Sequence, residues 1–76
     1  MIIKNSIIEL RKPIKVTQAE LADAVGVTRQ TILSLESGRY IASLPLAYKI
    51  AKFFNKAIEE VFIFTEEDEK NDRTAI

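Results

Sequence analysis

Hydrophobic residues recur at helical spacing in four stretches of the chain. The residues that share one side of each stretch are Ile7, Leu10 and Ile14; Leu21, Ala22 and Val25; Ile32 and Leu35; and Leu46, Ala47, Ile50, Ala51 and Phe54. Because residues three and four apart lie on the same face of an α-helix, this pattern predicts four amphipathic helices. One further turn of helix is predicted over residues 58–62.

Capping residues set the boundaries of the second and third helices. The sequence Thr17-Gln18-Ala19-Glu20 is a capping box, in which the Thr17 hydroxyl accepts from the Glu20 amide and the Glu20 side chain reaches back. Gly26 supplies the left-handed residue that ends this helix, and Thr28 begins the next helix, which stops at Ser37-Gly38. The connection over residues 26–28 is short enough to cross the two helices sharply.

The remaining signals complete a mainly α fold. Ser43 caps the fourth helix, Pro45 is tolerated in its first turn, and Asn55 is a left-handed stop. Residues 1–4 and 61–65 favour strands. We therefore predict a mainly α, five-helix domain over residues 1–65, with a small antiparallel sheet formed by the N- and C-terminal strands. Residues 66–76 are predicted to be an acidic, flexible tail.

The zero net charge of the 76-residue chain hides an asymmetry. Residues 1–56 carry nine basic and four acidic side chains, a net charge of +5, whereas residues 57–76 carry two basic and seven acidic ones, a net charge of −5. A neutral total therefore does not exclude a polyanionic partner for the first part of the chain.

Composition excludes several kinds of chemistry. The absence of cysteine excludes a disulfide framework and a thiolate metal site, and the absence of histidine removes the commonest general base. No nucleophile–base pair or phosphate loop is visible, so we expect neither an enzyme nor a cofactor. No apolar run reaches the roughly 20 residues of a membrane helix, and no charged-then-apolar leader opens the chain. We expect a cytoplasmic protein.

Three sequence motifs lie within and just after the second and third predicted helices. They are TQAELA at 17–22, VGVTRQTI at 25–32 and LESGRY at 35–40. In this order and spacing they resemble the helix-turn-helix of the XRE family, the phage-repressor and Cro-like DNA-binding domains. The resemblance covers about residues 5–62 and implies sequence-specific binding of double-stranded DNA.

A recognition helix must present hydrogen-bonding side chains near its N-terminus to reach base edges in the major groove. Arg29 and Gln30 occupy the first turn of the predicted third helix, and Ser34 lies one turn later on the same face. In family terms these three residues match the base-reading positions. Outside such a motif, Arg29 and Gln30 would be ordinary solvated helix residues.

Phosphate contacts position a DNA-binding domain without reading sequence. The resemblance implies that Gln18 holds the DNA backbone, and that Thr28, Ser37 and Arg39 contact phosphates at the two ends of the recognition helix. Thr28 is at the same time a helix cap. Tyr40 either touches phosphate or packs on its own loop.

Three further features follow from comparing the chain with the family pattern. That pattern pairs residues placed like Arg11 and Glu36 in a semi-buried ion pair, so we assign both a structural role. Lys15 stands where the family usually has glycine, and a left-handed backbone there would be strained. Ile41-Ala42 replace a common Asn-Pro, which adds apolar surface before the fourth helix.

An apolar patch is predicted from Ile41, Ile58, Val61 and Phe62, which either form a two-fold contact or complete the core of a monomer. A homodimer would place two recognition helices about 34 Å apart, one turn of B-DNA, on a palindromic operator. The leading hypothesis is a small dimeric repressor that regulates transcription. The alternative is an antitoxin-like or protein-interaction module with accessory DNA binding.

Overall fold

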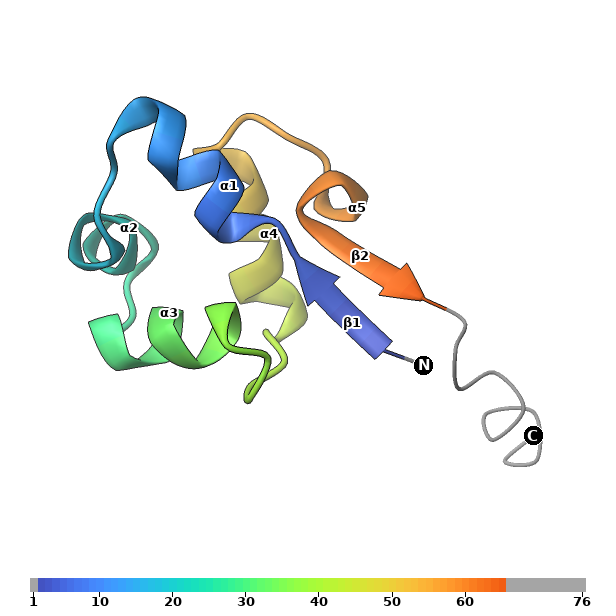
Figure 1. The fold of residues 1–76 in the computed structure, drawn as a ribbon. Coiled ribbons are helices and arrows are strands. Elements are labelled where there is room, and N and C mark those ends of the chain that lie inside the picture. The colour runs from blue at the N-terminus through green and yellow to red at the C-terminus, as the bar shows by residue number, and fades with distance from the viewer. Residues whose placement is uncertain (1, 66–76) are drawn as a thin grey trace.

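The computed structural model describes residues 2–65, so the predicted acidic tail at 66–76 lies outside the described residues. In chain order the elements are β1 (Ile2–Asn5), α1 (Ile7–Arg11), the 3₁₀ turn η1 (Lys12–Ile14), α2 (Gln18–Val25), α3 (Arg29–Glu36), α4 (Leu44–Phe53), α5 (Ile58–Val61) and β2 (Phe62–Thr65). In Figure 1, α3 lies along one edge of the molecule and the strands lie side by side at the other end. The predicted fold class is confirmed.

The helix-turn-helix is built by the predicted caps. The Glu20 amide donates to the Thr17 hydroxyl at 3.0 Å, and the Thr17 amide donates to the Glu20 carboxylate at 2.9 Å. Gly26 ends α2 with a φ of 77°, and the Thr28 hydroxyl accepts from the Thr31 amide to start α3. Local hydrogen bonds therefore set where both helices begin and where α2 ends.

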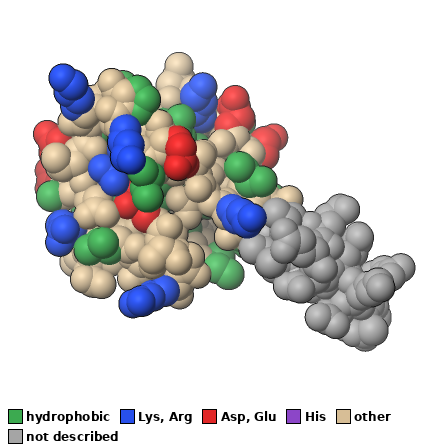
Figure 2. All heavy atoms as spheres, viewed as in Figure 1, with side chains coloured by type: hydrophobic (Ala, Val, Ile, Leu, Met, Phe, Trp, Pro, Cys, Tyr) green, Lys and Arg blue, Asp and Glu red, His purple; other side chains and the backbone are tan. Residues whose placement is uncertain are grey.

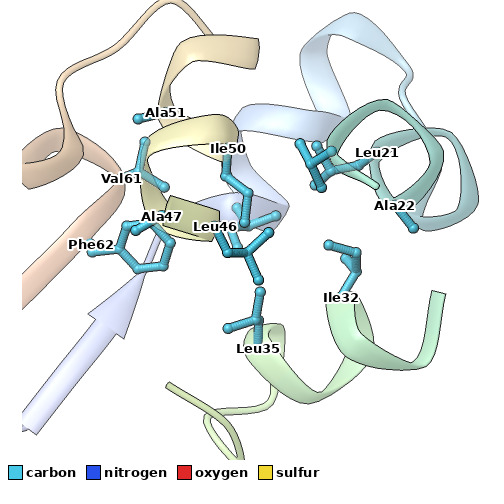
Figure 3. Packing of buried hydrophobic residues seen from close by; sticks show 12 residues of the cluster. Leu21, Ala22, Ile32, Leu35, Leu46, Ala47, Ile50, Ala51, Val61 and Phe62 are labelled. Carbon is cyan, nitrogen blue, oxygen red and sulfur yellow. The ribbon is translucent and has the colours of Figure 1, made fainter. Parts of the chain in front are cut away.

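The core lies where α2, α3 and α4 meet. Ile32 and Leu35 of α3 point toward Leu21 of α2 and Leu46 of α4 (Figure 3), and all four side chains are buried. Burial of each large aliphatic side chain stabilises the fold by roughly 1.5–3 kcal/mol. One face of α3 is thus committed to the core, and the opposite face points outward.

The sheet joins the two ends of the described chain. β1 and β2 pair antiparallel, with Ile3 opposite Phe64 and Asn5 opposite Phe62. The Asn5 side-chain amide donates to the Leu35 carbonyl at 2.7 Å. The sheet is therefore attached to the last turn of α3 as well as to α5.

The predicted inward position of Ile14 is wrong, because this side chain is 56% exposed. The chain tightens into the 3₁₀ turn η1 before it reaches Ile14, and Lys15 then adopts the left-handed conformation with a φ of 57°. A 3₁₀ turn has three residues per turn instead of 3.6, so it shifts the following side chains off the helical stripe. Asn55 (φ 56°) adopts the predicted left-handed conformation, and at Lys15 the structure has the strained one of the two possible backbones.

The predicted apolar patch needs correction. Val61 is fully buried and Phe62 is 5% exposed, so both already pack inside a single chain. Ile41 is 65% exposed, and Ile58 is half-buried against the core. Val61 and Phe62 therefore complete the core of the single chain, the second of the two possibilities for them. With so little exposed area, they cannot supply the main surface of a two-fold contact.

Candidate nucleic-acid interface

The outward face of α3 carries the residues predicted to read bases. Arg29 and Gln30 are exposed in the first turn, and Ser34, four residues after Gln30, is half-buried. Figure 1 shows that α3 lies at the edge of the molecule, and no other element of residues 2–65 lies beyond it. An exposed helix of eight residues is long enough to enter a major groove.

Two shallow hollows run along this face. One is lined by Thr28, Gln30, Thr31, Ser34 and Tyr40, and the other by Gln30, Leu33, Ser34, Ser37 and Arg39. Gln30 and Ser34 line both hollows, so they stand between them. Tyr40 is 45% exposed and borders the first hollow, which leaves its ring accessible beside the recognition helix.

Leu33 was not among the residues predicted for this face, because only polar side chains were considered as candidates to read bases. It lies four residues after Arg29 and borders the second hollow with Gln30. The signal was present in the sequence, because Leu33 is the one leucine of this helix that does not share the stripe of Ile32 and Leu35.

The segment that follows α3 caps the helix. The Ser37 amide donates to the Leu33 carbonyl at 3.0 Å, and the Ser37 hydroxyl donates to the Ser34 carbonyl at 3.1 Å. The amides of Arg39 and Tyr40 both donate to that same Ser34 carbonyl. The amide and hydroxyl of Ser37 thus both donate to carbonyls of α3, and the side chains of Arg39 and Tyr40 are exposed.

Arg11, Gln18 and Glu36 form one polar network beneath the recognition helix. Arg11 Nε lies 2.7 Å from Glu36 Oε2 and Nη2 lies 3.2 Å from Oε1, as expected for the predicted ion pair. Gln18 Nε2 donates to Glu36 Oε1 at 2.8 Å, and Arg11 Nη1 donates to the Val16 carbonyl at 3.0 Å. The side chains of Arg11 and Glu36 are only 14% and 4% exposed, so the buried carboxylate is fully matched by donors.

Glu20 is the acidic residue in the first turn of α2. The hydrogen bond from the Thr17 backbone amide, followed by the one with the Thr17 side chain, lowers the pKa of this exposed carboxyl. The charged form is favoured because a carboxylate accepts these hydrogen bonds better than a neutral acid does.

Charged side chains of both signs lie on the described surface. In Figure 2, blue Lys and Arg side chains are spread over the helical body, and red acidic side chains lie among them as well as near α5. Arg29 and Arg39 are exposed at the two ends of α3. Helix α3 is therefore flanked by positive charge, which favours a polyanionic partner.

A second surface feature is apolar. A hollow on the sheet side is lined by Ile3, Ile41, Ala42, Leu44, Ala47, Ile58, Phe62 and Phe64. Within this set, Ile41, Leu44 and Phe64 are 65%, 73% and 52% exposed.

Among residues 2–65, no helix has the length and apolar character needed to cross a membrane.

Comparison with known proteins agrees with this geometry. The Helix-turn-helix family profile matches residues 7–61, which is most of the described chain. The match includes the capped helix pair α2–α3, the core helix α4 and the short helix α5.

Relatives occur in archaea and bacteria. An HTH-type transcriptional regulator of Archaeoglobus fulgidus is 54% identical over 86% of this chain and 92% of its own length. The regulator MJ0272 of Methanocaldococcus jannaschii is 50% identical over 87% of this chain and 98% of its own length. The regulator YgzD of Bacillus subtilis is 46% identical, over 86% of this chain and 98% of its own length. This chain therefore belongs to the XRE-type helix-turn-helix family of DNA-binding transcription regulators.

Proposed function

We propose that this protein binds a specific sequence of double-stranded DNA by placing α3 in the major groove. The observation that carries the proposal is the outward face of α3, where Arg29 and Gln30 are exposed at the helix N-terminus. An arginine can pair with guanine O6 and N7, and a glutamine with adenine N6 and N7. Ser34 lies one turn further along and adds a hydroxyl that can donate or accept.

Phosphate contacts are proposed on both sides of α3. Arg39 and Tyr40 lie beyond its C-terminus, Gln18 in the first turn of α2 contacts Glu36 at this same end, and Thr28 caps the N-terminus. Gln18 already donates to Glu36, and a primary amide has a second N–H, so it can hold a phosphate and the recognition helix together. Since the donors of Ser37 are occupied, the proposal at this end depends on Arg39 and Tyr40.

The apolar hollow on the sheet side is proposed as the homodimer contact. Ile41, Leu44 and Phe64 are exposed hydrophobic residues that line it, and Ile58 lines it as well. A two-fold contact here would present two copies of α3 to a palindromic operator, with half-sites about 34 Å apart. Occupation of an operator blocks other proteins from the same DNA, so we propose that binding represses transcription.

The same hollow favours one alternative function. An exposed apolar surface of this kind also suits a different protein, in which case the chain would be an antitoxin-like or protein-interaction module with accessory DNA binding. The two functions differ in stoichiometry, because a regulator binds DNA as two identical copies and an adaptor requires the second protein.

Selection from a random duplex pool tests the function directly. We expect a palindromic sequence, bound by two copies of the chain per duplex. The double variant Arg29→Ala, Gln30→Ala should lose this preference. The control Lys49→Ala removes an exposed positive charge on α4, outside both hollows along α3, and should keep it. An unselective wild-type protein would contradict the proposal.

A further inference from the structure

Leu33 occupies an unusual position for a hydrophobic residue of this fold. It is half-buried, yet it is not among the partly buried hydrophobic residues of the described chain that pack against the core. It lines a hollow on the outward face of α3 together with Gln30, Ser34, Ser37 and Arg39.

Helix geometry places Leu33 near the middle of the outward face. Residues four apart lie one above the other on a helix, so Leu33 lies between Arg29 and Ser37. Gln30, three residues before it, is its other neighbour on this face. A leucine here cannot donate or accept a hydrogen bond, so any base it meets must be recognised by apolar contact.

The major groove offers one apolar group for such contact, the 5-methyl group of thymine. We propose that Leu33 is a specificity-determining residue that packs against a thymine methyl, one turn along the groove from the base pairs read by Arg29 and Gln30. This inference rests on the proposed function. It adds a thymine to the half-site and distinguishes thymine from cytosine at that position.

A double-mutant cycle with modified DNA tests the contact. Each thymine of the selected half-site is replaced in turn by deoxyuridine, which removes the methyl and keeps all hydrogen bonds. At one position the wild-type protein should bind about fourfold more weakly per half-site, corresponding to the ~0.8 kcal/mol of one buried methyl-sized group. Leu33→Ala should bind the thymine and deoxyuridine duplexes equally at that position.

Two further variants sharpen the experiment. Leu33→Met keeps an apolar side chain and should retain sensitivity to the methyl group. Ile14→Ala removes another exposed hydrophobic side chain, far along the chain from α3, and should leave the deoxyuridine penalty unchanged. Thermal unfolding of each variant, followed by circular dichroism, verifies that the helices are intact.

The outcomes separate this inference from the function on which it rests. If the wild-type protein selects a sequence but Leu33→Ala keeps the full deoxyuridine penalty, the Leu33 contact is refuted and sequence-specific binding stands. A selected half-site without a methyl-sensitive thymine refutes it equally. If the wild-type protein selects no sequence, both proposals fail.

Discussion

Gln18 Nε2 lies 2.8 Å from Oε1 of Glu36, joining the first residue of α2 to the last residue of α3. Arg11 of α1 holds both oxygens of the same carboxylate. Three helices are thus connected through one buried side chain. The contact therefore ties the N-terminus of α2 to the C-terminus of α3.

Removal of the Glu36 carboxylate should destabilise the fold strongly. Glu36→Ala leaves the Arg11 guanidinium, only 14% exposed, without its counter-charge, and loss of one partner of a buried pair costs roughly 3–5 kcal/mol. Urea unfolding measures the change in the free energy of unfolding. Glu59→Ala, an exposed glutamate, is the control and should change it by less than about 0.5 kcal/mol. Equal stabilities for the two variants would contradict a structural role for the network.

Arg39 should act through a phosphate rather than a base. Arg39→Ala should weaken binding by a similar factor for all DNA sequences, and the slope of log K against log salt should fall by about one per subunit. Titrations at four or more salt concentrations measure the slope, with Lys49→Ala as the control of equal charge. A changed sequence preference would instead place Arg39 at a base edge.

Lys15→Gly should stabilise the protein. The left-handed conformation, at a φ of 57°, costs a residue with a Cβ roughly 1–2 kcal/mol, and glycine avoids most of that cost. We expect a gain of about 1 kcal/mol in urea unfolding, with DNA affinity unchanged. Lys12→Gly changes the same residue type at a right-handed position and should destabilise instead. A destabilised Lys15→Gly would contradict the assigned backbone strain.

The capping box should make part of the stability of α2 depend on pH. Because the folded-state pKa of Glu20 is lowered, its contribution is present above the unfolded-state pKa and is lost as the pH falls through the folded-state pKa. Nuclear magnetic resonance of the side-chain carboxyl should give a midpoint below the ordinary glutamate value. In Thr17→Ala, which lacks the hydroxyl, the midpoint should move back toward that value. An unchanged midpoint would show that the Thr17 hydroxyl does not contribute.

Two neighbouring residues of β2 offer a matched test of the dimer contact. Phe64 borders the apolar hollow, whereas Ile63, of similar exposure, points to the other face of the strand. Phe64→Asp should yield a monomer in sedimentation equilibrium, and Ile63→Asp should remain dimeric. Phe62 is unsuitable for this test, since a charge at that buried position would unfold the chain. A dimer that survives Phe64→Asp would place the interface elsewhere.

Features that depend on neighbouring residues could be predicted from the sequence. The capping box at Thr17, the left-handed stops at Gly26 and Asn55, and the turn between α2 and α3 all arise from hydrogen bonds or backbone preferences within a few residues. The exposure of Arg29 and Gln30 could also be predicted from the sequence, because Ile32 and Leu35 lie on the opposite face of α3 and pack in the core.

Features that depend on the detailed course of the backbone could not be predicted in this way. Ile14 fits the helical stripe by spacing, but the 3₁₀ turn carries it out to solvent. The amide and hydroxyl of Ser37 donate to the Leu33 and Ser34 carbonyls at the end of α3, which its residue type did not indicate. In both places the geometry of the turn that ends the helix decides where the group points.

The amino-acid sequence alone determined the five helices, the helix-turn-helix and the charged face that it exposes, since short-range periodicity and capping specify each of them. Only the tertiary structure decided which apolar residues remain outside. Val61 and Phe62 are buried because they pack in the core cluster with residues of α1–α4, whereas Ile41, Leu44 and Phe64 remain exposed. Burial is a property of packing between distant segments, so the pattern of residues along one segment does not specify it.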